Sequence, residues 1–170
     1  GMFEEIRYFS RGKHADVHDT KFGKLGVLVC EDLWHMSLPL LQALKGAKVI
    51  IGIAVSPTRL ALNSKSKILK NYEINSEQHR AYARLLSIYM VFCNRVGYED
   101  GVNFWGGSEI VDPFGTVDKV AKFFDEDMIT SEINMNSIKR ARQLARHFLD
   151  EDVNFLRNEV QLLHDELAKI

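Results

Sequence analysis

The chain has 170 residues and a formal net charge of -1, with 46% hydrophobic and 26% charged residues. These values are typical of a globular domain with a sizeable core and argue against a disordered chain. Lysines and arginines are scattered rather than gathered in a basic stripe, so we expect neither nucleic acid nor a membrane as a partner. No apolar run approaches the roughly 20 residues that cross a bilayer, and no charged-then-apolar leader opens the sequence.

The small number of cysteines indicates a reducing compartment. Cys30 and Cys93 are the two cysteines of the chain, and two are too few for a disulfide framework. We therefore expect two free thiols in a reducing environment and predict a cytoplasmic location.

Short β-branched runs alternate with amphipathic stretches through most of the chain, which favours an α/β layer structure. Residues 25–29 and 49–55 are predicted to be buried strands, with a short helix at residues 38–44 between them. A helix capped by Ser76 and a strand at residues 89–94 are expected to follow.

The stretch "GGSEIVDPFGTVDKVAKFF", residues 106–124, consists of two extended segments around the tetrapeptide Asp-Pro-Phe-Gly at residues 112–115. Proline at the second position and glycine at the fourth are typical of a tight turn. We therefore predict a β-hairpin.

The end of the chain is charged and helical from Asn136 onward. Its apolar residues repeat at steps of three and four: Val153, Leu156, Val160, Leu163 and Leu167. Such a seam needs a partner surface, which is either the chain's own domain or another subunit.

Cys30 is the first candidate for chemistry, in the stretch "GVLVCEDLWH" at residues 26–35. A cysteine that ends an apolar strand is most often a small core residue. However, the reactive groups of α/β proteins gather at the carboxyl ends of strands. A nucleophilic thiol also needs an oxyanion donor, which the backbone amide of Glu31 can supply if the chain turns there.

Histidines near Cys30 offer an alternative that the pattern does not favour. His35 lies five residues after the cysteine, and nothing in the sequence fixes it against the thiol. His14 and His18 are spaced for a metal site only if they lie on a helix, but their stretch looks extended and lacks a third ligand. We expect no metal.

Three segments, in order, resemble the carbon-nitrogen hydrolase (nitrilase) superfamily: "GKLGVLVCEDLWH", "GAKVIIGIAVSP" and "CNRVGYEDGVNFWGGSEIVDPFGTV". The similarity runs from about Phe3 to Arg142 and is greatest to the glutamine-amidase domain of glutamine-dependent NAD synthetases and to free-standing amidases of that type. The resemblance implies a four-layer α-β-β-α sandwich and a Glu-Lys-Cys triad. In that chemistry a thiolate attacks an amide or nitrile carbon, ammonia or an amine leaves, and water resolves the thioester, with no metal or cofactor.

Within the resemblance, Cys30 matches the catalytic nucleophile. Glu5, in "FEEIRYF", matches a second glutamate that braces the catalytic site, and the preceding glutamate is the alternative match. Glu5 can also be an ordinary solvated acid on the surface. Glu31 and Ser56 match positions of substrate contact. Arg59 is positioned to pair with a substrate carboxylate, although it can equally hold a loop.

The chain departs from the family pattern at its start. In the family, the base glutamate and the oxyanion lysine both precede the "FEE" stretch, whereas this sequence begins there. We therefore expect a sandwich that lacks its N-terminal part and exposes apolar strand edges and faces. The predicted organisation is a partial carbon-nitrogen hydrolase domain at residues 1–142 and a C-terminal helical tail at residues 143–170.

The sequence thus predicts hydrolysis of a non-peptide carbon–nitrogen bond, from amide to acid plus ammonia, with the glutamate and the lysine upstream of this chain. One alternative is a catalytically inactive, truncated homologue that acts as an assembly module. Another is the glutaminase portion of an NAD synthetase. The expected partners are a small-molecule amide and, because the seam and the unpaired sheet favour self-association, at least one further copy of the chain.

Overall fold

The computed structural model describes residues 7–58 and 69–169 of the chain. Its helices, 3-10 turns (η) and strands are, in order, β1 (Val17–Thr20), β2 (Gly23–Val29), η2 (Cys30–Trp34), α1 (Ser37–Leu44), β3 (Val49–Ala54), α2 (Lys70–Leu86), β4 (Tyr89–Asn94), β5 (Val96–Glu99), β6 (Val102–Trp105), β7 (Glu109–Val111), β8 (Val117–Val120), α3 (Met135–Leu144), η3 (Arg146–Phe148) and α4 (Val153–Leu167).

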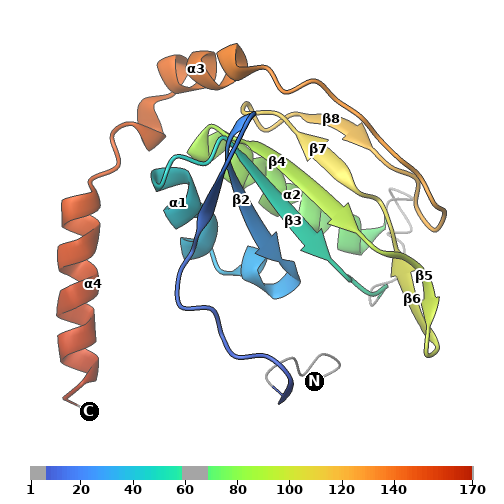
Figure 1. Cartoon of the computed structure of the whole chain (residues 1–170), viewed down its shortest axis with the longest axis horizontal. Helices are drawn as coiled ribbons and strands as arrows, with labels where there is room; N and C mark the ends of the chain where they lie inside the picture. The colour runs from blue at the N-terminus through green and yellow to red at the C-terminus, as the bar shows by residue number, and fades with distance from the viewer. Residues whose placement is uncertain (1–6, 59–68, 170) are drawn as a thin grey trace.

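The main sheet has six strands in the order β1-β2-β3-β4-β7-β8 (Figure 1). Its central strands β2, β3 and β4 are parallel, and the outer strands pair antiparallel. Parallel neighbours need crossover connections, which α1 and α2 supply. The carboxyl ends of β2 and β3 therefore lie at one edge of the sheet, where Cys30 and Ser56 follow them.

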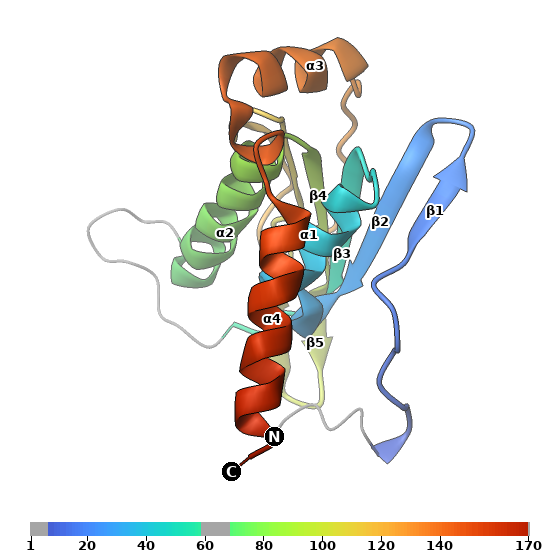
Figure 2. The same ribbon diagram turned by 90° about the vertical axis from the view of Figure 1, so that its left-hand side faces the viewer.

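One face of the sheet is covered by α1 and α2, which lie on the same side of it (Figure 2). Leu28, Ile50 and Met90 point to this face from adjacent strands and are 3%, 0% and 0% exposed. At Gly52 a Cβ atom would lie 2.7 Å from Leu33 Cδ1, so a larger residue there would displace the Leu33 side chain that packs η2 on β3. This close packing fixes the turn that directly follows Cys30.

The other face of the sheet is covered at one end only. There, Ile133 and Ile138 pack near Val49 and Tyr89 at the start of β3 and β4. Towards the carboxyl ends of the strands the apolar side chains are exposed, and we call this surface the open face: Val27, Val29, Ile53 and Cys93. The prediction of an exposed apolar sheet face is confirmed.

Most strands and helices expected from the sequence are present, but the predicted cap at Ser76 is wrong. Helix α2 begins at Lys70, so Ser76 lies inside it and is buried. Its hydroxyl donates to the buried carboxylate of Glu109 at 3.0 Å, which removes the cost of placing a polar side chain there.

The hairpin at residues 106–124 is confirmed by β7 and β8, which pair antiparallel around the predicted turn. A second hairpin, β5–β6, was not expected. Its turn residues Asp100 and Gly101 have φ values of 50° and 77°. Two positive values are characteristic of a type I′ turn, for which Asp-Gly is a preferred pair, so the signal was present in the sequence.

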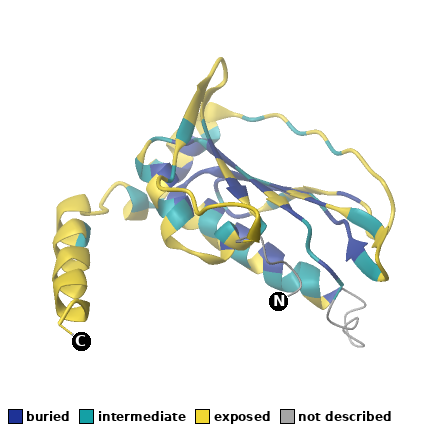
Figure 3. Cartoon of the chain, turned by 60° about the horizontal axis from the view of Figure 1, so that its bottom comes forward, coloured by how far each residue is buried: buried dark blue, intermediate teal, exposed yellow. Residues whose placement is uncertain are grey.

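The helical tail stands apart from the sheet (Figures 1 and 3). No residue of α4 is buried. Helix α3 spans the predicted boundary between residues 142 and 143, and the division into domain and tail stays a prediction. Among the helices of the described ranges, none combines the length and the apolar character needed to cross a membrane.

Candidate active site

Cys30 lies at the point where β2 ends and η2 begins. Its φ is 48°, in the left-handed region that residues other than glycine seldom adopt, and such strain concentrates at functional sites. The turn is held by Asp32, whose carboxylate accepts a hydrogen bond from the backbone N–H of Val29 at 2.9 Å. Cys30 is partly buried, whereas the neighbouring Glu31 is exposed.

Helix α2 holds the same turn from the other side. The carbonyl oxygen of Leu33 accepts hydrogen bonds from Gln78 Nε2 and from the Tyr82 hydroxyl, both at 2.9 Å. Burial raises the pKa of the Tyr82 phenol, so this hydroxyl keeps the proton that it donates. Two donors from one helix make the turn after Cys30 rigid, as a positioned nucleophile requires.

A cavity of about 460 Å³ opens beside Cys30 at the carboxyl ends of the strands. Its described lining residues come from η2, the end of β3, the first turns of α2, and β4: Cys30, Glu31, Leu33, Trp34, Ala54, Val55, Ser56, Pro57, Asn71, Ile74, Asn75 and Phe92. Three of the five predicted site residues, Cys30, Glu31 and Ser56, are therefore brought together. The described lining contains one acid and no lysine.

Ser56 is oriented by two partners from other strands. Its backbone N–H donates to Asn94 Oδ1 at 2.9 Å, and its hydroxyl oxygen accepts from Trp105 Nε1 at 3.1 Å. Trp105 is completely buried. Because an indole N–H can only donate, the Ser56 oxygen acts as an acceptor there and its own proton is available to a ligand. Ser56 is thus prepared to bind an oxygen atom that accepts hydrogen bonds.

Two asparagines of α2 complete the polar wall of the cavity. Asn71 Nδ2 donates to the carbonyl oxygen of Pro57 at 3.2 Å, and Asn75 Nδ2 donates to the carbonyl oxygen of Asn71 at 2.7 Å. Neither asparagine is among the residues predicted from the sequence, because the predicted helix starts only at Ser76. A helix assigned from Lys70 would have placed them one turn apart, on the same side.

A buried polar cluster lies behind the cavity wall. His79 Nδ1 is 2.7 Å from Glu109 Oε1, and both side chains are buried. The His79 ring packs on Phe92 with centroids 4.4 Å apart, and Phe92 lines the cavity. Neither His79 nor Glu109 is among the residues that line the cavity, so the cluster supports its wall rather than contacting a ligand.

The histidines considered from the sequence do not line the cavity. His14 and His18 are exposed, and His18 lies in the extended strand β1. His35 is exposed at the end of η2 and does not line the cavity. In the part of the chain that the structure describes, no three His, Cys, Asp or Glu residues are grouped to hold a metal ion.

Glu5 and Arg59, the two other predicted site residues, lie outside the described residues. Their assignments as a brace of the catalytic site and as a substrate contact stay predictions.

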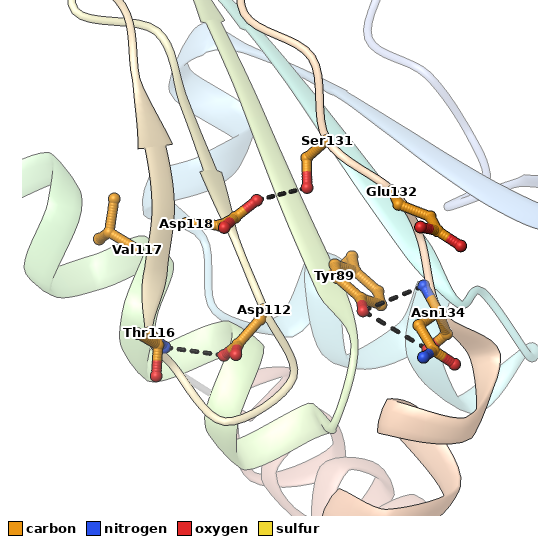
Figure 4. A pocket seen from close by; sticks show the side chains of 8 residues that line it. All are labelled: Tyr89, Asp112, Thr116, Val117, Asp118, Ser131, Glu132 and Asn134. Atoms are coloured by element: carbon orange, nitrogen blue, oxygen red, sulfur yellow. Dashed lines mark hydrogen bonds between the residues drawn. The ribbon is translucent and has the colours of Figure 1, made fainter.

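A second hollow, of about 430 Å³, lies at the opposite edge of the sheet, near the start of β4 (Figure 4). Several of its polar groups are paired with one another. Asp112 accepts from the backbone N–H of Thr116, the Ser131 hydroxyl donates to Asp118, and the Tyr89 hydroxyl accepts from the backbone N–H of Asn134. These pairs hold the hairpin turn and the segment before α3 in place, and no thiol lies among its described lining residues.

Cys30 follows the carboxyl end of a parallel strand and lies beside a cavity, which is where reactive groups of α/β proteins gather. The carbon-nitrogen hydrolase family model matches residues 1–143. The chain therefore belongs to the carbon-nitrogen hydrolase family, as the sequence motifs indicated.

Individual relatives differ in function. The chain is 31% identical over 145 residues to a glutamine-dependent NAD(+) synthetase of Aquifex aeolicus, and the match covers 84% of this chain and 24% of that protein. It is 26% identical over 149 residues to an N-carbamoylputrescine amidase of Oryza sativa subsp. japonica, with 82% and 48% covered. The chain thus spans about a quarter of the first relative and about half of the second.

Solved structures confirm the α/β fold. A carbon-nitrogen hydrolase from Helicobacter pylori G27 superimposes with a TM-score of 0.79 at 24% identity, covering 94% of this chain and 57% of that one. A glutamine-dependent NAD+ synthetase from Acinetobacter baumannii gives a TM-score of 0.70 at 25% identity, covering 81% of this chain and 24% of that one.

Proposed function

We propose that this chain carries the nucleophile and one wall of the substrate pocket of an enzyme that hydrolyses an amide to an acid and ammonia. The observation that carries the proposal is the strained position of Cys30 at the mouth of a cavity that also contains the Ser56 hydroxyl. Family membership supports hydrolysis of a carbon–nitrogen bond in general.

In the proposed reaction, Cys30 Sγ attacks the amide carbon after a base takes the thiol proton, and a tetrahedral oxyanion forms. The C–N bond then breaks, the nitrogen takes up a proton and ammonia leaves, so that a thioester remains on Cys30. Water attacks the thioester carbon, releases the acid and returns the proton to the thiolate. The backbone N–H of Glu31 follows the nucleophile directly and is the nearest donor in sequence for the oxyanion.

Substrate recognition is assigned to the other residues of the cavity. The Ser56 hydroxyl is suited to a carbonyl or carboxylate oxygen of the substrate, and the exposed carboxylate of Glu31 to an amino group at the rim. Arg59 is proposed to pair with a substrate carboxylate, and Glu5 to position a catalytic lysine.

The general base and the cation that stabilises the oxyanion are proposed to come from a segment upstream of this chain. This follows from the resemblance to the Glu-Lys-Cys triad, and the absence of a lysine among the described lining residues is consistent with it. The open face supports the same proposal, since an apolar sheet face is a surface on which a second sheet can pack.

The test is ammonia release from glutamine, asparagine and a panel of small amides by the protein extended upstream. We expect Cys30→Ala to abolish turnover, and Cys93→Ala, which changes the other thiol, to retain it. Turnover that survives Cys30→Ala would refute the proposal. Preference for glutamine would favour the glutaminase portion of an NAD synthetase, whereas preference for another amide would favour a free-standing amidase.

A second candidate function is an inactive assembly module, which the open face and the exposed tail helix favour. It predicts no turnover in either form of the protein. It also predicts that Cys30→Ala leaves self-association unchanged.

A further inference from the structure

Helix α4 is a formed helix that buries none of its residues against the rest of the described chain. Asp152 caps its start, because its carboxylate accepts from the backbone N–H groups of Asn154 and Phe155 at 2.9 and 3.0 Å. The helix has 15 residues, and none is buried. Isolated helices of about this length are marginal in water, so tertiary or intermolecular packing normally supplies their stability.

Five of the seven apolar residues of α4 form a continuous stripe that we call the α4 seam: Val153, Leu156, Val160, Leu163 and Leu167. Four of them are more than half exposed. Their spacing of three and four residues corresponds to the a and d positions of a heptad repeat, the pattern by which two helices pack along each other. The seam is therefore suited to another helix rather than to a flat surface.

Acidic and basic side chains lie on opposite sides of the seam. In the heptad register, Asp152, Glu159 and Glu166 occupy g positions on one side, and Arg157 and His164 occupy e positions on the other. In a parallel pair, a g residue of one helix faces the e residue five positions later in its partner. Asp152 therefore faces the cation of Arg157 in a second copy, and Glu159 faces the imidazole of His164. An antiparallel pair would instead place acid beside acid and base beside base.

We propose that α4 pairs with α4 of a second copy of this chain, in parallel and seam to seam. The charge pattern is self-complementary in this arrangement, which favours a second copy over an unrelated helix. The pairing gives the α4 seam the cover that it lacks in the single chain. Because it concerns a surface away from the cavity, it is independent of the proposed function.

The first test compares adjacent leucines. Leu162 and Leu163 are equally exposed, at 57% and 55%, but only Leu163 belongs to the seam. We expect Leu163→Glu to raise the dissociation constant of the dimer by at least about tenfold in sedimentation velocity, because a buried leucine is lost from each copy. The matched variant Leu162→Glu should change it by less than about threefold. Equal effects of the two variants, or a monomeric wild-type chain, would overturn the proposal.

The second test addresses the relative orientation of the two α4 helices. Because its substitutions all lie on α4, it also separates α4 pairing from association through the open face. His164→Glu places a new acid opposite Glu159 in a parallel pair and should weaken dimerisation, and adding Glu159→Lys should restore it. Asn158→Glu adds the same charge on the outer side of the helix and is the control. Tighter dimerisation by His164→Glu alone would contradict the parallel arrangement, since an antiparallel pair would bring the new acid near Arg157.

Discussion

The two faces of the main sheet have the same kind of sequence and opposite surroundings. On one face, Ile50 of β3 is completely buried beneath the helices. On the other, Ile53 of the same strand is 47% exposed, and Val29 beside it is 50% exposed. Strands that are apolar on both faces are typical of parallel sheets buried on both sides. The difference teaches that β2 and β3 have the sequence of strands buried on both faces, while the described chain covers the second face at one end only.

The largest expected effect is on catalysis. The 170-residue chain alone should hydrolyse amides near the background rate, because loss of one oxyanion donor typically costs about 100- to 1000-fold and the base is proposed to be absent as well. Ammonia release should appear when the chain is extended upstream and should disappear again with Cys30→Ala. Cys30-dependent turnover by the 170-residue chain would contradict the account. It would show that catalysis does not need a segment that covers the open face.

Stability should respond differently on the two faces. Ile50→Ala removes a fully buried side chain and should lower the free energy of unfolding by about 2–5 kcal/mol. Ile53→Ala, on the open face of the same strand, should cost less than about 1 kcal/mol in this chain. Urea unfolding measures both. In the protein extended upstream, the cost of Ile53→Ala should rise towards that of Ile50→Ala, and an unchanged cost would argue that nothing covers the open face.

Substrate binding should depend on the orientation of Ser56. Ser56→Ala should raise KM by about 2- to 10-fold, the effect of one lost hydrogen bond. Trp105→Phe keeps an aromatic side chain but removes the N–H that donates to Ser56, so it should also raise KM and should change kcat by a smaller factor than KM. Ser131→Ala, in the second hollow, is the control for serine loss and should leave KM unaltered. Steady-state kinetics of the extended protein decide this.

The smallest expected effect is a change in alkaline stability. Burial raises the pKa of Tyr82 above its ordinary value of 10.0. A raised pKa means that the contribution to stability is complete below about pH 10 and is lost as the pH rises through the folded-state value. Tyr82→Phe should cost about 1 kcal/mol at about pH 7, through the hydrogen bond to Leu33, and should flatten the decline above about pH 10. An equally steep decline in the variant would assign that decline to other groups.

The sequence predicted the parts of the fold that local patterns determine. Apolar runs located β3 and β4, and the Asp-Pro-Phe-Gly turn located the β7–β8 hairpin. The start of α2 was missed because its cap residue, Leu69, makes no side-chain hydrogen bond and carries no capping signal. The β5–β6 hairpin was missed although Asp100-Gly101 signals it.

Local patterns also predicted part of the candidate site. Cys30, Glu31 and Ser56 follow strand ends, which apolar runs reveal, and the structure brings them together at one cavity. The support of Ser56 by Trp105 joins residues 49 positions apart, and the bond from Tyr82 to Leu33 spans the same separation. Such contacts depend on how α2 and the hairpins pack on the sheet, which no local pattern records.

The most direct test of the central claim, that an upstream segment covers the open face, is alkylation of Cys93. This thiol is exposed beside Ile53, whereas Cys30 is partly buried at the cavity. Iodoacetamide labelling with peptide mapping should modify Cys93 readily in the 170-residue chain and should slow strongly at Cys93, but not at Cys30, in the protein extended upstream. Equal labelling of Cys93 in both forms would contradict the account.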